Sequence, residues 1–286
     1  MAEIIDWGLD WVTLTTDERF SPDSEEAVLM RNIVRRDWYG GQSGVEVSPW
    51  GWNGYSGLSF GPLSMGYRPD GSIVRCSGPA SRLIGRMPWS AGWRCTRVDL
   101  QATVRLSGEG VDEHIGNLVA PAAMARTRAV GRPWSIKLIN GYGDGDTLQI
   151  GSRTSAVYMR VYNKHAESSF ADEFKNCVRY EAEIKNGVAD KVFWGLNGRT
   201  IGDTKPLEVL QAAFLKRGIS IDGAIGEFQE SWLNTVPRET DADRQLSWLE
   251  KSVAGVVRKL IGQGLHTEVL QALELEPYAT MFVRGE

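Results

Sequence analysis

Three segments in the middle of the chain alternate between apolar and polar residues. In VYMRVYNK (residues 157–164), valine, methionine and valine alternate with tyrosine, arginine, tyrosine and lysine. A period of two predicts a β-strand with one apolar and one polar face. The same alternation runs through TRVDLQATVRL (96–106) and RYEAEIK (179–185). Paired in one sheet, these strands would collect their charged and tyrosine side chains on a single face.

Weaker patterns predict the other elements. Apolar runs bounded by turn residues indicate strands at 10–16, 57–66, 73–76, 136–140 and 147–151. Helical spacing indicates helices at 21–37, 79–86, 112–128 with a break before Pro121, 188–196 and 207–217. The expected fold is α+β: a central, mostly antiparallel sheet with helices on one face and a polar, catalytic face opposite.

The last part of the chain changes character. Apolar residues at i, i+3 and i+4 spacing from residue 241 to 260, then a second helical stretch at 266–273, predict a small C-terminal helical region. Pro237 marks the expected boundary. We therefore expect a large first domain at 1–236, with an N-terminal part (1–90) and a catalytic sheet (91–236), followed by the helical region at 237–286.

Composition limits the possible functions. No apolar run reaches the roughly 20 residues that span a bilayer, and MAEIIDWGLDW lacks the features of a secretory signal. A cytoplasmic protein without membrane contact is expected. The three cysteines are widely spaced, which predicts free thiols, and the 11 tryptophans are interpreted as core residues. The chain carries −4 overall, but residues 68–164 contain 14 Lys or Arg against 7 Asp or Glu, which favours local contact with a polyanion.

Carboxylates on the polar face could bind a metal ion. Asp99, Glu181 and Glu183 would lie on neighbouring strands, and oxygen ligands of this kind suit Mg²⁺ or Mn²⁺. The alternative is that they form ion pairs with Arg97 or other cations across the strands. Spacing alone favours the ion pairs.

The tyrosines of the polar face suggest nucleophilic chemistry. A phenol has a pKa of about 10, so a catalytic tyrosine needs cations or a metal to stabilise the phenolate. Arg160 and Lys164 flank Tyr162 on its own face of the predicted strand. Attack on a DNA phosphodiester would give a phosphotyrosyl link and a free sugar hydroxyl. Against this, tyrosine is common in strands because it packs well there.

Three blocks in order carry a family resemblance. WRCTRVDL, then LQIGSRTSAVYMRVYNKHAE, then VRYEAEIK resemble the signature blocks of the trans-acting Rep family of replication initiation factors, which includes initiators of rolling-circle plasmids and phages and related relaxases of integrative elements. IDWGLDWVTLT near the start is similar to the family's first strand, and DRQLSWLEKSVAGVVRKL to the C-terminal helix of phage-type members. The likeness covers most of the chain.

The resemblance implies a metal-dependent, site-specific DNA nickase and strand transferase that initiates rolling-circle replication through a 5′-phosphotyrosyl intermediate. It implies Tyr162 and Lys164 as the family's Tyr-x-Lys element, with Asp99 and Glu181 in the metal site. Its second acidic position falls on Thr103, so Glu183 or Glu167 would complete the site. Implied partners are origin DNA, nicked as a single strand or an extruded hairpin, a host helicase and polymerase, and a second copy in a homodimer.

Several alternatives stay open. Tyr158 is the rival nucleophile or a stacking residue for an unpaired base, and Arg153 is a candidate phosphate clamp, with Arg97 a further candidate for DNA binding. A relaxase of an integrative or conjugative element would use the same chemistry. An origin-binding protein of the same fold without activity is a third interpretation, and it rests on the missing acid at Thr103.

Overall fold

The computed structural model describes residues 2–19, 47–85, 92–108, 110–129, 133–196 and 205–221, with isolated positions between 24 and 32, at 87 and 89, and between 257 and 265. Chain contacts divide the protein into residues 1–234 and 235–286. All the elements below belong to the first unit. The predicted C-terminal helical region lies outside the described residues except for a few positions, as does most of the predicted helix at 21–37.

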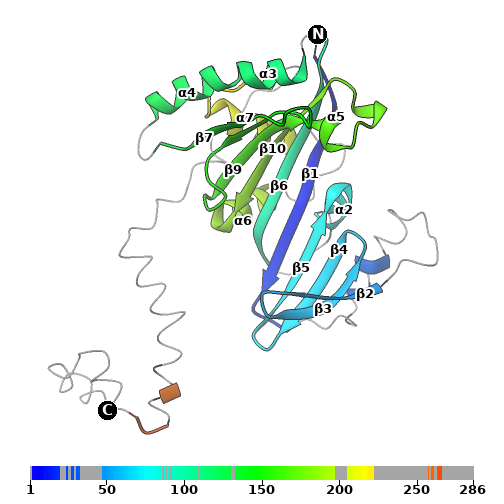
Figure 1. Ribbon diagram of the computed structural model, residues 1–286. Helices are drawn as coiled ribbons and strands as arrows, with labels where there is room; N and C mark the ends of the chain where they lie inside the picture. Colours follow the sequence, from blue (N-terminus) through cyan, green and yellow to red (C-terminus); the bar gives the residue numbers. More distant parts are fainter. Residues whose placement is uncertain are drawn as a thin grey trace, which may run out of the picture. The chain divides into compact units, whose positions relative to one another are not determined.

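One antiparallel sheet organises the first unit (Figure 1). Its spatial order is β2-β3-β4-β5-β1-β6-β10-β9-β8-β7. The strands are β1 (Glu3–Thr16), β2 (Val47–Trp52), β3 (Tyr55–Phe60), β4 (Leu63–Arg68), β5 (Gly71–Ser77), β6 (Arg94–Arg105), β7 (Ile136–Ile139), β8 (Thr147–Ile150), β9 (Val157–Asn163) and β10 (Cys177–Lys185). The long strands β1 and β6 lie at its centre and join an N-terminal half, β2 to β5, to a half made of β10, β9, β8 and β7.

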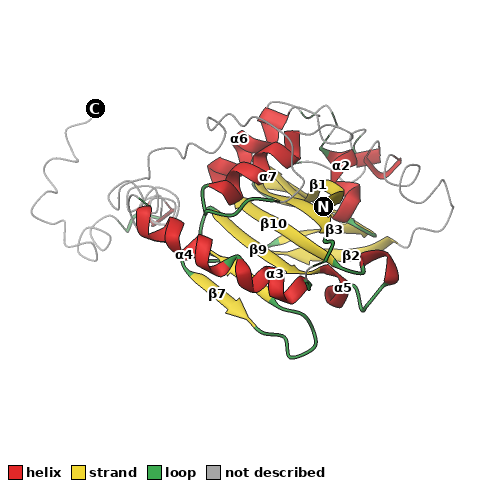
Figure 2. Cartoon of the chain, turned by 90° about the horizontal axis from the view of Figure 1, so that it is seen from above, coloured by secondary structure: helices red, strands yellow, loops and turns green. Residues whose placement is uncertain are grey.

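Short helices connect and cover the strands. They are η1 (Gly78–Ala80), α2 (Ser81–Ile84), α3 (Val111–Asn117), α4 (Val119–Arg128), α5 (Lys164–Glu167), η2 (Asp172–Phe174), α6 (Asn186–Leu196) and α7 (Lys205–Leu215). The helices α6 and α7 lie against β6 and β10 (Figure 2). No helix in the described ranges is long and apolar enough to cross a bilayer.

The apolar face of the sheet packs against these helices, as the alternation predicts. Val98, Leu100, Ala102 and Val104 of β6 are buried in the main core, as are the corresponding residues of β9 and β10. Tyr180 of β10 joins two helices to the sheet: its ring meets Phe214 of α7 at 5.4 Å, and its hydroxyl lies 2.7 Å from His114 Nε2 of α3. A buried hydroxyl at hydrogen-bond distance from a buried imidazole leaves neither group unpaired in the core.

The fold confirms the predicted α+β class and the predicted break before Pro121 in the helix at 112–128, and it corrects two details. β2 was not predicted. Lys164 does not continue β9, because the side chain of Asn163 accepts a hydrogen bond from Ala166 N (3.1 Å) and caps α5, which starts at Lys164. The predicted helix at 112–128 is two helices, and they separate at Leu118, before Pro121.

Candidate active site

A cleft of about 650 Å³ opens on the polar face of the sheet. Its floor comes from β1, β6, β10 and β9, and its rim from the turn between β7 and β8 and from α5. The predicted site residues Arg97, Asp99, Arg160, Tyr162 and Glu181 all line it. Residues more than 80 positions apart in the sequence therefore meet at one site.

Strand register explains why these side chains converge. β6 pairs with β10 and β10 pairs with β9, so that Asp99 lies opposite Glu183, Gln101 opposite Glu181, and Glu181 opposite Arg160. Directly opposed residues on one face have Cβ atoms roughly 5 Å apart. Continuous antiparallel pairing thus places the polar residues of β6, β9 and β10 in one patch.

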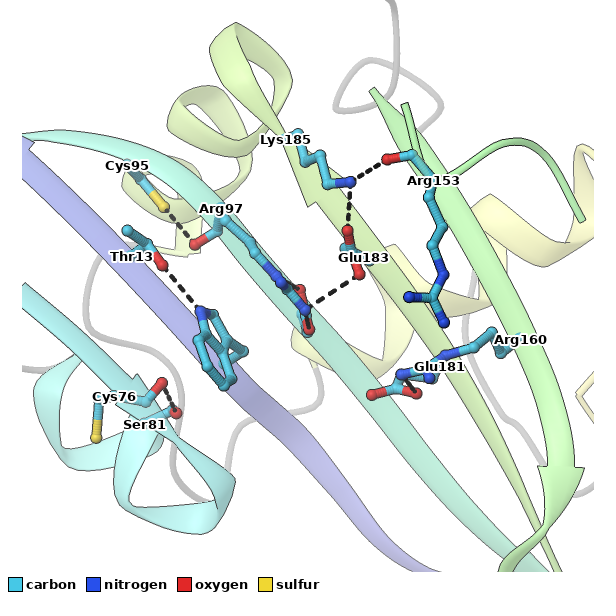
Figure 3. Close-up of polar contacts among 12 residues, drawn as sticks. Thr13, Cys76, Ser81, Cys95, Arg97, Arg153, Arg160, Glu181, Glu183 and Lys185 are labelled. Carbon is cyan, nitrogen blue, oxygen red and sulfur yellow. Dashed lines mark hydrogen bonds and ion pairs between the residues drawn. The ribbon is translucent and has the colours of Figure 1, made fainter. Parts of the chain in front are cut away.

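Buried ion pairs hold the carboxylates in place (Figure 3). Arg97 donates through Nε to Asp99 Oδ1 (2.9 Å) and through Nη2 to Asp99 Oδ2 (2.6 Å), and its Nη2 also lies 3.1 Å from Glu183 Oε2. Arg160 Nη2 donates to Glu181 Oε2 at 2.5 Å. These pairs fix each carboxylate on the floor against a specific guanidinium.

Burial shifts the ionisation of the site. Burial raises the pKa of the Asp99 carboxyl to about 7, despite its hydrogen bonds from Arg97. It also raises the pKa of Glu181 above its ordinary value, and the nearby charge of Asp10 adds to the rise. The carboxylates of the floor repel one another in a poorly solvated place, so the floor favours added positive charge.

Tyr162 lies among these groups as a neutral phenol. Burial raises its pKa above the ordinary value, and the charge of Glu181 raises it further, against the opposite effect of Arg179. The Arg160 guanidinium lies 5.8 Å from the ring centroid. Lys164 does not line the cleft; its Nζ pairs with Glu167 Oε2 at 2.5 Å and lies 5.2 Å from the Phe174 ring centroid. The expectation that Lys164 stands beside Tyr162 on a strand is therefore not met.

Tyr158, Glu183 and Arg153 do not line the cleft. Tyr158 is only 2% exposed, and its hydroxyl has no hydrogen-bond partner within the described residues. The Arg153 guanidinium lies 6.0 Å from the Tyr158 ring centroid. Glu183 is paired with Arg97 and Lys185, and Lys185 Nζ also donates to the Arg153 carbonyl (Figure 3).

Two residues of the cleft escaped the sequence prediction of the site. Asp10 lies where the pairing of β1 and β6 shifts between Leu9 and Trp11, and such an irregularity re-aims a side chain. Arg179 of β10 lies opposite Tyr162 and donates through Nε to the hydroxyl of buried Thr103 (3.0 Å). Alternation did place Arg179 on the polar face, but nothing in the sequence showed Asp10 turning into the cleft.

The contact between Thr103 and Arg179 gives a structural role to the position where the family resemblance expects a second acidic residue. Thr103 bonds Arg179 without neutralising it, whereas a carboxylate there would form an ion pair. Glu167 lines the cleft from α5, where its carboxylate is paired with Lys164. No group of three or more His, Cys, Asp or Glu residues within the described ranges is arranged to hold a metal ion.

Comparisons with known proteins show the family of this chain and the likeness of its fold. A family profile described as "Replication initiation factor" matches residues 111–273, more than half of the chain. The chain belongs to the replication initiation factor family. The matched part of this initiation factor contains Tyr162 and Glu181, and Asp99 precedes it.

A solved structure shows the same fold. The rolling-circle replication initiator protein of Geobacillus stearothermophilus is 20% identical to this chain and superposes on it with a TM-score of 0.50. The matched region covers 80% of this chain and 94% of that protein. At that identity the likeness concerns the fold. No curated protein matches this initiation factor closely.

Proposed function

We propose that this initiation factor is a DNA nickase and strand transferase that starts rolling-circle replication with Tyr162 as its nucleophile. The observation that supports this most is the cleft itself, which brings a tyrosine, two buried carboxylates and three arginines onto one rigid sheet face. Sites built on strands hold reacting groups more precisely than loops do. The substrate would be origin DNA, presented as a single strand or an extruded hairpin in the cytoplasm.

The proposed reaction exchanges one phosphodiester for another. The Tyr162 oxygen attacks phosphorus, the bond from phosphorus to the 3′ oxygen breaks, and the phenol proton is taken up so that the strand ends in a 3′ hydroxyl. The 5′ phosphate stays on Tyr162. Because both bonds are phosphodiesters, the link can later be transferred to a 3′ hydroxyl, which rejoins the strand.

Arginines of the cleft would bind the phosphate. Arg179 keeps its full charge because Thr103 only orients it, and it lies directly opposite Tyr162. Arg160 lies close to the Tyr162 ring, and its charge is shared with Glu181. Guanidinium groups stabilise the added negative charge of a five-coordinate phosphorus through paired hydrogen bonds.

The donor set fits one divalent cation. Asp99 and Glu181 would supply carboxylate oxygens, whose pKa values are raised chiefly by burial. Mg²⁺ is commonly held by one or two carboxylates together with substrate phosphates. Asp10, Asp144, Asp146 and Glu167 are the further carboxylates that line the cleft. Mg²⁺ or Mn²⁺ bound there would polarise the phosphate and offset the Glu181 charge that disfavours the Tyr162 phenolate.

A covalent-adduct assay tests the proposal. The purified protein is incubated with Mn²⁺ or Mg²⁺ and single-stranded oligonucleotides tiled across its own replicon, and adducts are separated on a denaturing gel. We expect Tyr162→Phe to abolish the adduct. Tyr158→Phe is the matched control, because it removes a hydroxyl that forms no hydrogen bond in the described structure, and it should leave the adduct intact.

The possible results separate the candidate functions. An adduct that survives in Tyr162→Phe overturns the assignment of the nucleophile. Origin binding without an adduct from any oligonucleotide identifies a binding protein that lacks activity. An adduct formed only with a conjugative transfer origin identifies a relaxase. Gel filtration of the DNA complex tests the proposed homodimer, and addition of a host helicase and polymerase tests those partners.

A further inference from the structure

A second cluster lies on the same sheet face, toward β2. The guanidinium of Arg75 on β5 lies 4.8 Å from the Trp11 ring centroid, 5.6 Å from that of Trp50 and 4.8 Å from that of Trp52. We call these four residues the indole platform. Trp52 is 43% exposed, so the sequence interpretation of the tryptophans as core residues is wrong for this one.

Strand register builds the platform on the face opposite the core. Val74 and Cys76 of β5 point into the core, which turns Arg75 to the other side. Trp50 of the edge strand β2 pairs with Gly57, and Gly57 pairs with Gly66. A Cβ on Gly66 would lie 2.8 Å from Cζ3 of Trp50. The glycine therefore leaves the space in which the indole lies over the neighbouring strands.

The platform is continuous with the cleft. Trp11 belongs to both, because it lines the cleft and lies against Arg75. Its ring also lies 4.8 Å from the Arg97 guanidinium, which binds Asp99 on the cleft floor. A ligand that enters the cleft can therefore extend over Trp11 onto the platform without leaving the sheet face.

The charge of the platform is positive. Arg75 forms no ion pair or hydrogen bond within the described residues, whereas Arg97 and Arg160 of the cleft are paired with carboxylates. The pKa of Arg75 is lowered by burial and by repulsion from Arg97. One exposed and two half-buried indoles around an unneutralised guanidinium complement a ligand that alternates flat rings with negative charges.

We infer that the indole platform binds the unpaired bases of a single-stranded DNA segment next to the phosphate held in the cleft. Bases stack on Trp50 and Trp52, and Arg75 contacts the phosphate between them. The inference rests on the proposed function for the identity of the strand in the cleft. Such stacking tolerates any base sequence, because every base has a π-face.

Non-covalent binding of a homopolymer tests this inference separately from the nicking chemistry. A labelled oligo-dT of roughly 12 nucleotides, within the range of single-strand sites, is titrated by fluorescence anisotropy without divalent metal. We expect binding with quenched tryptophan fluorescence, and dissociation constants roughly tenfold higher in Trp52→Ala and Arg75→Ala. Arg75→Ala should also reduce the slope of log K against log salt by about 0.7, the value for one phosphate contact to a single strand.

Matched controls remove similar groups from helices on the other side of the sheet. Leu215→Ala on α7 removes an exposed apolar side chain, and Arg126→Ala on α4 removes an exposed cation. Both should bind oligo-dT like the wild type. Trp52→Phe keeps an aromatic ring and should retain most of the binding, and thermal melting by circular dichroism checks that each variant is folded.

The outcomes are distinct from those of the adduct assay. The platform is overturned if the wild type does not bind oligo-dT, or if both Trp52→Ala and Arg75→Ala bind it as the wild type does. Neither result would bear on the Tyr162 chemistry. Loss of oligo-dT binding in those two variants supports the platform even where no covalent adduct forms.

Discussion

The two halves of one sheet face use arginine in opposite ways. In the cleft, Arg97 and Arg160 are held by the buried carboxylates of Asp99 and Glu181. On the indole platform, the partners of Arg75 among the described residues are aromatic rings. The strands, the alternation and the direction of the side chains are the same in both halves. The difference lies in the groups that contact the arginine, and it separates the proposed site for a reacting phosphate from the proposed surface for bases.

Buried pairs and stacked cations also differ in what they contribute to stability. A buried ion pair adds little net stability, but the loss of one partner is costly because the other charge remains buried. A guanidinium stacked on rings contributes about 0.5–1 kcal/mol and leaves no unpaired buried charge when it is removed. The cleft should therefore be sensitive to single substitutions and the platform tolerant of them.

The largest expected stability effect comes from Arg160→Ala. It leaves the Glu181 carboxylate buried without its partner, and we expect a loss of about 2–3 kcal/mol in the free energy of unfolding. The loss is limited because the pKa of Glu181 is already raised by burial, so the carboxyl can take up a proton. Arg75→Ala should cost less than about 1 kcal/mol. Urea unfolding measures both.

A double substitution checks that the loss of stability in Arg160→Ala comes from the unpaired Glu181 carboxylate. Glu181→Gln added to Arg160→Ala removes the stranded charge and should recover most of the lost stability. Equal losses in Arg160→Ala and Arg75→Ala would mean that the two halves do not differ as described.

A smaller effect is expected when an orienting group of the cleft is removed. Thr103→Val takes away the hydroxyl that accepts a hydrogen bond from Arg179 Nε, so the guanidinium is less well placed for the phosphate. We expect the rate of adduct formation at saturating oligonucleotide to fall about tenfold, as for a loss of about 1.4 kcal/mol, with oligo-dT binding unchanged. Thr103→Ser should restore the rate, and a valine variant with the wild-type rate would show that Thr103 has no positioning role.

A still smaller effect, on oligo-dT binding, is expected from a substitution in the strand beneath the platform. Gly66→Ala places a methyl group against Trp50 and should weaken oligo-dT binding by about threefold, less than the loss of a whole stacking ring. The rate of adduct formation should not change. Gly187→Ala in the first turn of α6 is the matched control, because a Cβ there meets nothing within 4 Å. An equal effect of both substitutions would argue against the position of the Trp50 ring.

The smallest effect is expected on the alkylation rate of the cysteines, which lie in the core behind both halves of the sheet face. Burial raises the pKa of the Cys76 thiol to about 12 and that of Cys95 above its ordinary value. Below these pKa values the thiols stay protonated, so alkylation at pH 8 should be slow in the wild type and in the platform variants. Iodoacetamide labelling followed by mass spectrometry measures this. Rapid labelling of Cys76 in Gly66→Ala would show that the substitution disturbs the core and not only the indole.

Much of the fold could be predicted from the sequence. Strict alternation identified β6, β9 and β10 and the face on which each side chain lies, because a strand has only two faces. β2 escaped, because VSPWGW contains a proline and a glycine and does not alternate; it is an edge strand, where proline costs little hydrogen bonding. Lys164 was misplaced because the cap formed by Asn163 depends on a local turn that alternation does not reveal.

The candidate site was also predictable in part, because alternation along a strand shows which side chains share a face. Asp99, Arg160, Tyr162 and Glu181 were placed on one face, and they do share a cleft. Tyr158 lies on the same face by alternation, yet it is buried outside the cleft. The pattern of one strand says which way a side chain points, but neighbouring strands decide how far it is covered.

The sequence by itself determined the strands β6, β9 and β10, their polar face and most of the residues on that face, because these depend on local periodicity. Only the tertiary structure decided which members meet. The order of strands in the sheet places β6, β10 and β9 side by side, the irregular pairing after Leu9 turns Asp10 inward, and the glycine of β4 leaves space for the Trp50 indole. Each of these depends on pairing between segments far apart in the chain, which a local pattern does not contain.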